Sequence, residues 1–185
     1  MDPKTQATTA VQLLTPLVDG TSADQLDLAT PCSKWTVRGL INHVVGGGHM
    51  FAAGLNDEAL GGDPNADLLG TDHKAAYHAA IDAFTAALAH ADDLDKPVTL
   101  PFGTLPTAVA LQLAAGDLLV HSWDLATSTG QAFDPPVDFV ESSYAFFQFA
   151  VNDDLRNAGL FGPIVDVPAD SAPFTKLLAH AGRAA

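Results

Sequence analysis

The stretch AVALQLAAGDLLV, residues 108–120, decides the expected fold because it is apolar on almost every side. A helix with this pattern is expected to be central and buried. Three polar side chains nevertheless occur at helical spacing, Asp117, His121 and Asp124. At about 100° per residue, His121 lies roughly 40° and Asp124 roughly 20° from Asp117, so all three project from one face. A buried carboxylate is costly unless it is compensated, so this face predicts either a metal site or a hydrogen-bonded pair.

A second candidate ligand lies earlier in the chain, where residues 36–55 are expected to form a helix with Thr36 as its N-cap. His43 has only small or apolar neighbours one turn away, so its imidazole is expected to point inward. The run Gly46–Gly48 follows, although each glycine costs a helix roughly 1 kcal/mol relative to alanine. These glycines indicate either room for a metal ion and its ligand, or close helix packing or a local kink.

Around these two segments the chain reads as helices separated by Gly, Pro and Asp. Apolar periodicity predicts helices at 5–18, 36–55, 72–91, 107–129, 137–156 and 174–180. Residues 98–100 and 161–168 are expected to be extended. No repeat or long linker interrupts the pattern, so a single all-α domain, residues 1–185, is expected, built on four or five packed helices.

The composition of the chain indicates which classes of partner it does not bind. Its 185 residues include 22 acidic and 8 basic side chains, which gives a formal net charge of −14. Nucleic acid and anionic membrane surfaces repel such a protein, so neither is expected as a partner. No apolar run reaches the roughly 18 residues of a membrane span, and no signal peptide is visible. With Cys32 as the single cysteine, a cytoplasmic location is expected.

Several residues are interpreted outside the ligand set. Asp124 is expected either to orient a ligating histidine, an arrangement common around metal sites, or to act as a cap. Cys32 indicates either an inert thiol or a thiolate near the mouth of the site. Trp35 is expected to be a core or rim aromatic, and His180 to be solvent-exposed. The other histidines show no ligand spacing and are expected to lie outside the site: His49, His73, His78 and His90.

Three runs of sequence carry a resemblance to a known family. They are TPCSKWTV at 30–37, LINHVVGG at 40–47 and HSWDLA at 121–126. They resemble the DinB-like metal-binding helical bundle proteins, in particular those related to the N-terminal domain of mycothiol-dependent maleylpyruvate isomerase. The resemblance covers nearly the whole chain. It implies a four-helix bundle with a divalent ion at one end, followed here by an extra helix and a short closing segment.

The resemblance also implies the metal ligands, which map to His43, Asp117 and His121. Asp117 departs from the family pattern, because the isomerase has a glutamate at this position and aspartate is one methylene shorter. Zn²⁺ is the expected ion, with Ni²⁺, Fe²⁺ and Mn²⁺ as alternatives. The isomerase has a further C-terminal domain that contributes to its active site, whereas only about 55 residues follow Gly130 here.

Three hypotheses for function follow. In the first, the ion activates a low-molecular-weight, mycothiol-like thiol for transfer to, or isomerisation of, a small electrophile. In the second, the same pocket is a non-catalytic binding module for a metal or small ligand. In the third, Asp117 and His121 form a structural polar pair without a metal. A homodimer is also considered, because helical bundles readily present an apolar face.

Overall fold

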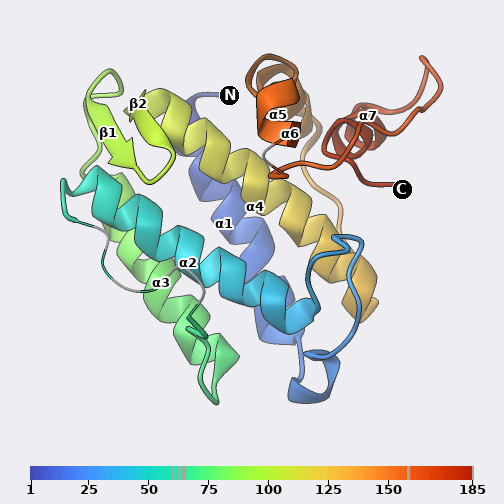
Figure 1. Ribbon diagram of the computed structural model, residues 1–185, viewed down its shortest axis with the longest axis horizontal. Helices are drawn as coiled ribbons and strands as arrows, with labels where there is room; N and C mark the ends of the chain where they lie inside the picture. Colours follow the sequence, from blue (N-terminus) through green and yellow to red (C-terminus); the bar gives the residue numbers. More distant parts are fainter. Residues whose placement is uncertain (60, 62, 64–65, 158, 185) are drawn as a thin grey trace.

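The computed structural model describes residues 1–59, 61, 63, 66–157 and 159–184, and it is mainly helical (Figure 1). The helices are α1 (Pro3–Gly20), α2 (Val37–Leu55), α3 (His73–Ala89), α4 (Thr107–Thr129), α5 (Val137–Ala150), α6 (Asp153–Asn157) and α7 (Pro173–His180). A short 3₁₀ turn, Ala23–Gln25, follows α1, and the strands β1 (Pro97–Leu100) and β2 (Gly103–Pro106) precede α4. The expected all-α class is confirmed.

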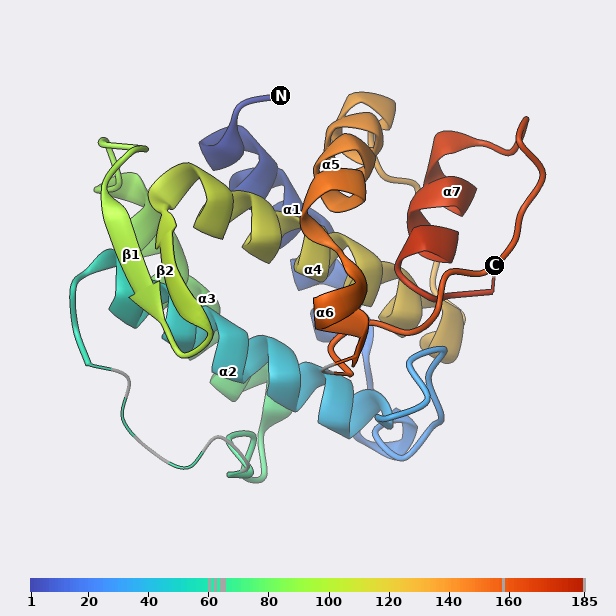
Figure 2. The same cartoon turned by 45° about the horizontal axis from the view of Figure 1, so that its top comes forward.

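Helices α1 to α4 form the central bundle. Helix α1 packs along α4 and α2 packs along α3, while contacts between α2 and α4 and between α1 and α3 close the arrangement (Figure 2). The largest fully buried side chains come from all four helices and from α5 and α7: Leu14, Leu40, Ile41, Tyr77, Phe84, Leu111, Leu119, Leu125, Phe139, Phe147, Leu177 and Leu178. Among the described helices, none is long and apolar enough to cross a membrane.

Local capping explains where these helices begin and end. Asp2, Thr36 and Asp72 each accept a hydrogen bond from the backbone N–H three residues later, which satisfies a donor that the first turn leaves free. Helix α4 ends where Gly130 adopts a left-handed conformation, with φ of 71°. The expected N-cap at Thr36 is therefore confirmed.

The hairpin before α4 extends beyond the single extended piece expected at 98–100. Strands β1 and β2 pair antiparallel, from Pro97 opposite Pro106 to Leu100 opposite Gly103. Only β1 shows a clear alternation of buried and exposed side chains. The second strand consists of four residues between a glycine and a proline, so periodicity gave no signal for it.

The single helix expected at 137–156 is wrong, because two helices occupy this range. Helix α5 ends before Val151, whose φ of −89° and ψ of 91° are extended. The Val151 side chain is buried in the core, and the Asn152 side chain accepts a hydrogen bond from the N–H of Leu155 at the start of α6. Burial of Val151 and this local cap override the helical periodicity. Residues 161–168 form no regular element, and the final helix is confirmed as α7.

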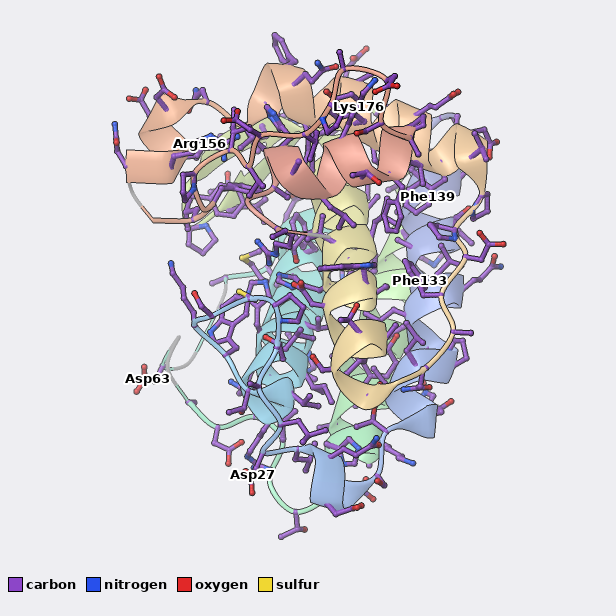
Figure 3. All side chains as sticks on the ribbon, turned by 90° about the vertical axis from the view of Figure 1, so that its right-hand side faces the viewer. Asp27, Asp63, Phe133, Phe139, Arg156 and Lys176 are labelled. Atoms are coloured by element: carbon purple, nitrogen blue, oxygen red, sulfur yellow. The ribbon has the colours of Figure 1, made fainter. Side chains whose placement is uncertain are left out.

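Helices α5 to α7 form a second layer against α4. Helix α5 packs on both α4 and α7, and Figure 3 shows this layer from the side, with Arg156 of α6 and Lys176 of α7 labelled. The layer approaches α4 closely at Gly116, where a Cβ atom would collide with the Phe147 ring. Because Asp117 follows directly, the contact fixes α4 next to its polar residues.

Candidate metal centre

Helices α2 and α4 bring the three expected ligands together. His43 lies in the first half of α2, Asp117 lies at the middle of α4, and His121 lies one turn further along α4. One potential ligand atom from each residue lies within 4.8 Å of the others. The His43 Nε2 atom is 3.2 Å from Asp117 Oδ2, and His121 Nε2 is 3.4 Å from Asp117 Oδ1. The Asp117 carboxylate therefore sits between the two imidazoles.

This donor set fits a divalent metal ion. Ligands bonded at about 2.0–2.2 Å to a tetrahedral Zn²⁺ lie roughly 3.3–3.6 Å apart, which is close to the two separations above. Two imidazole nitrogens and one carboxylate oxygen also suit Ni²⁺, Fe²⁺ and Mn²⁺. The same distances suit hydrogen bonds, so a polar cluster without a metal has the same geometry.

The cluster is open on one side and closed on the other. The side chains of His43 and Asp117 are 37% and 39% exposed, whereas that of His121 is 6% exposed. An incoming ligand can therefore reach the cluster from the side of His43 and Asp117. Three protein ligands with one accessible side are the pattern of catalytic rather than structural zinc sites.

Behind His121, Asp124 is fully buried and acts as its hydrogen-bond acceptor. The Nδ1–H group of His121 donates to Asp124 Oδ2 at 2.9 Å. This bond directs Nε2 toward Asp117, which is the tautomer that a metal ligand requires. Asp124 thus has the place expected for a residue that orients a ligand.

Arg183 completes this buried arrangement, and the sequence reasoning missed it. Its Nη2 and Nε groups donate to Asp124 at 2.8 and 3.2 Å, and Nη1 donates to the carbonyl of Ala181 at 2.9 Å. The Arg183 side chain is 9% exposed and that of Asp124 is 0% exposed. One signal could have found it. A buried Asp124 carboxylate needs a cation as partner, and the chain has only 8 basic residues from which that partner can come.

The charges in this cluster shift its protonation equilibria. Burial raises the pKa of the Asp117 carboxyl, but the adjacent His121 and His43 outweigh burial and hold that pKa well below its ordinary range. Burial lowers the pKa of His121, but Asp117 and then Asp124 raise it to about 9. For Asp124, the hydrogen bonds from His121 and Arg183 outweigh burial and lower the pKa. Without a metal, an imidazolium therefore faces two carboxylates.

Trp35 forms a wall of the site. Its ring stacks on His43 with a centroid distance of 4.4 Å and an interplanar angle of 23°, and its centroid lies 5.3 Å from that of His121. The Trp35 carbonyl and the Cys32 carbonyl both accept a hydrogen bond from the Thr30 hydroxyl, at 2.8 and 2.9 Å. Trp35 is thus a rim aromatic with a specific contact to a candidate ligand, and Cys32 lies half-buried in the same loop.

The remaining histidines lie outside the cluster. His49 is exposed, His73 contacts the carbonyl of Thr21, and His78 contacts Asp19. His90 is the exposed C-cap of α3. The expectation of an exposed His180 is wrong, because it is half-buried and its Nε2 lies 3.1 Å from the Phe147 carbonyl. Docking of α7 on α5 explains this difference.

The run Gly46–Gly48 shows both close helix packing and open space. A Cβ atom on Gly48 would lie 3.2 Å from the Ala80 carbonyl oxygen of α3, so Gly48 allows close helix packing. A Cβ atom on Gly47 would meet nothing within 4 Å. Within the run, the open space is therefore at Gly47, and Gly48 is the glycine that packs against α3.

Comparison with known proteins places these features in a family. The family model "Mycothiol maleylpyruvate isomerase N-terminal domain" matches residues 7–126. Two curated relatives from Mycobacterium tuberculosis, uncharacterized protein Rv0738 of strain H37Rv and uncharacterized protein MT0763 of strain CDC 1551, are each 32% identical to the chain over 188 residues. Each alignment covers 99% of this chain and 98% of the relative.

A solved structure supports the fold. A single-residue mutant of mycothiol-dependent maleylpyruvate isomerase matches with a TM-score of 0.63 and 13% sequence identity. The match covers 77% of this chain and 66% of the isomerase chain. At this identity the likeness establishes the shared bundle and carries no activity with it.

Proposed function

Because the chain belongs to the mycothiol maleylpyruvate isomerase N-terminal domain family, we propose that it is a metal-dependent enzyme that uses a low-molecular-weight, mycothiol-like thiol. The observation that carries the proposal is the set of donor atoms of His43, Asp117 and His121 within 4.8 Å, open on one side. The substrates proposed are the thiol and a small electrophile, and the reaction is thiol transfer or thiol-assisted isomerisation.

The residues have distinct parts in this proposal. His43, Asp117 and His121 hold the ion, Asp124 orients His121, and Arg183 keeps Asp124 ionised. Trp35 keeps the His43 ring in place by stacking. When bound, a divalent ion supplies the lowered thiol pKa that makes a thiolate available at neutral pH. The exposed sides of His43 and Asp117 give the thiol its way in, and the buried side of His121 excludes water.

The first test is elemental analysis of protein prepared without chelators or a histidine tag. We expect about one equivalent of Zn²⁺, or of Ni²⁺, Fe²⁺ or Mn²⁺, in the wild type, and its loss in His43→Ala and Asp117→Ala. His49→Ala is the matched control, because His49 lies on the same helix but is exposed outside the cluster. A wild type that takes up no metal on reconstitution would favour the structural pair and contradict the proposal.

The second test measures chemistry. Metal-loaded protein is mixed with mycothiol and methyl vinyl ketone. In the addition reaction, the sulfur of mycothiol bonds to the terminal alkene carbon of the ketone, and the thiol proton is transferred to the carbon beside the carbonyl. We expect faster adduct formation than in buffer, with the acceleration lost in His43→Ala and kept in His49→Ala. Saturable thiol binding without acceleration of this or other electrophiles would instead identify a non-catalytic binding module.

A further inference from the structure

A small apolar slot is lined in part by Asp117 and so adjoins the candidate ligands His43, Asp117 and His121, which we call the metal-site cluster. It is lined by side chains of α2, α3 and α4, and its volume is about 20 Å³. A space of this size holds roughly one water-sized group. The residues that line it include Phe51, Phe84, Ala114 and Leu118, and Asp117 is its one polar lining residue among the described part of the chain.

Helical spacing explains why the slot adjoins the candidate ligands. On α2, Gly47 and Phe51 follow His43 at intervals of four residues, so they lie on the same face, one and two turns further on. On α4, Asp117 precedes His121 by one turn, and Ala114 precedes Asp117 by almost one turn. The slot is therefore the next layer of the same interface between α2 and α4.

Gly47 keeps this layer open. A Cβ atom there would meet nothing within 4 Å, in contrast to Gly48, which packs against α3. A larger side chain at position 47 would project from the face that carries His43 and Phe51, and would occupy the space beside Asp117. The residue that costs α2 helical stability is thus the residue that leaves room next to the cluster.

The chemistry of the walls selects an uncharged group. Two phenylalanines, an alanine and a leucine favour a hydrocarbon surface. No lysine or arginine is among the described residues that line the slot, so no side chain there pairs with an anion. A cation would lose its hydration against the apolar walls, because Asp117 already faces His43 and His121.

We propose that the slot between Gly47, Phe51 and Asp117 receives a short, uncharged alkyl group of the ligand bound at the metal-site cluster. The inference rests on the proposed function, and it narrows the substrate class to small, uncharged molecules that end in a methyl-sized group. Carboxylate-bearing electrophiles are then poor substrates. Gly47 is the specificity-determining residue.

The test uses simple thiols as probes of Co²⁺-loaded protein. Ethanethiol carries the alkyl group, and thioglycolate and cysteamine carry an anion and a cation of similar size. Dissociation constants come from the thiolate-to-cobalt absorption, corrected for the pKa of each thiol. We expect ethanethiol to bind at least tenfold more tightly than either charged probe. Gly47→Leu should remove most of this preference. A Cβ atom at position 47 meets nothing within 4 Å, so the rest of the leucine side chain has room to extend beside Asp117 and fill the slot.

Gly46→Leu is the matched control. A Cβ atom there makes only an ordinary contact of 3.5 Å with Leu68, and Gly46 does not line the slot. Cobalt content and melting temperature show that both variants keep the fold and the metal site. Equal binding of the three thiols, or an unchanged preference in Gly47→Leu, would overturn the slot assignment alone. Failure of every thiol to bind would overturn the proposed function and this inference with it.

Discussion

Arg183 and Asp124 form a two-point ion pair 59 residues apart in sequence, with N–O distances of 2.8 and 3.2 Å. Asp124 is simultaneously the acceptor for His121 Nδ1–H. The pair therefore links the segment after α7 to a candidate metal ligand on α4. The carboxylate of Asp124 thus has two roles: its ion pair with Arg183 stabilises the fold, and its hydrogen bond with His121 orients that imidazole.

Removing the cation should cost both stability and metal affinity. Arg183→Met leaves the Asp124 charge buried without its main partner, so we expect the free energy of unfolding to fall by about 3 kcal/mol. Zn²⁺ affinity should fall roughly 10- to 100-fold, because His121 loses its fixed orientation. Urea unfolding and competition with a chromophoric chelator measure the two effects.

Arg38→Met is the control for that substitution. Arg38 pairs with Asp67 at 2.6 Å, but their side chains are 34% and 58% exposed. Solvent screens such a pair, so we expect a much smaller loss of stability and no change in Zn²⁺ affinity. Equal effects of the two substitutions would contradict the role assigned to Arg183.

Removing the metal should lower the melting temperature. A ligand that binds only the folded state stabilises it by about 2.7 kcal/mol at 100 times its dissociation constant. We therefore expect chelated wild-type protein to melt earlier than Zn²⁺-loaded protein, by an amount that grows with free Zn²⁺. In Asp117→Ala, chelator and Zn²⁺ should leave the melting curve unchanged. Identical curves for the wild type with and without Zn²⁺ would favour the structural pair.

The metal-free protein should lose stability in mild alkali. In the folded state the pKa of His121 is raised to about 9, above the value of about 6.5 expected when unfolded. A raised pKa contributes stability that is fully present below about pH 6.5 and is lost as pH rises toward 9. Urea unfolding of chelated protein at pH 6.5 and 9.5 should show the loss, and His121→Gln should reduce it.

The same equilibrium predicts proton release on metal binding. His121 binds an ion only after Nε2 loses its proton, so Zn²⁺ affinity should increase with pH up to about 9. Calorimetry at pH 7.5 in buffers with different ionisation enthalpies counts the protons, and we expect about one. A proton count of zero would show that Zn²⁺ does not bind through His121.

Gly116 should tolerate no side chain. In Gly116→Ala the new methyl group meets the Phe147 ring, so we expect α5 to shift and the free energy of unfolding to fall by about 1–3 kcal/mol. Gly47→Ala is the contrasting variant, because it has open space and gains helix propensity of up to about 1 kcal/mol. Urea denaturation of both variants compares them, and the opposite order of stability would contradict the packing described here.

The helical spacing in the sequence was enough to predict the α-bundle and to bring His43, Asp117 and His121 together as a candidate set. Spacing within one helix fixes which side chains share a face, and the apolar surroundings of His43 indicated its direction. Arg183 was missed because a contact across 59 residues has no local signature. The stacking of Trp35 on His43 likewise depends on the path of a loop.

The errors in the C-terminal half have the same origin. The helical pattern of residues 137–156 is real, but burial of Val151 and the cap at Asn152 divide it into α5 and α6. Docking of α7 on α5 half-buries His180, which neither helix indicates by itself. In both places, tertiary contacts override the conformation or exposure that the local sequence indicates.

The contact between Arg183 and Asp124 also couples motion at the two places. Local opening of the segment after α7 leaves Asp124 without its cation, and this loosens His121. Occupation of the cluster by an ion favours the ordered His121, so by reciprocity it disfavours that opening. Amide hydrogens of Leu177 and Leu178 should then exchange with deuterium more slowly when Zn²⁺ is present, although neither residue is a candidate ligand. A metal ion bound by the cluster would in this way stabilise the docking of the last helix.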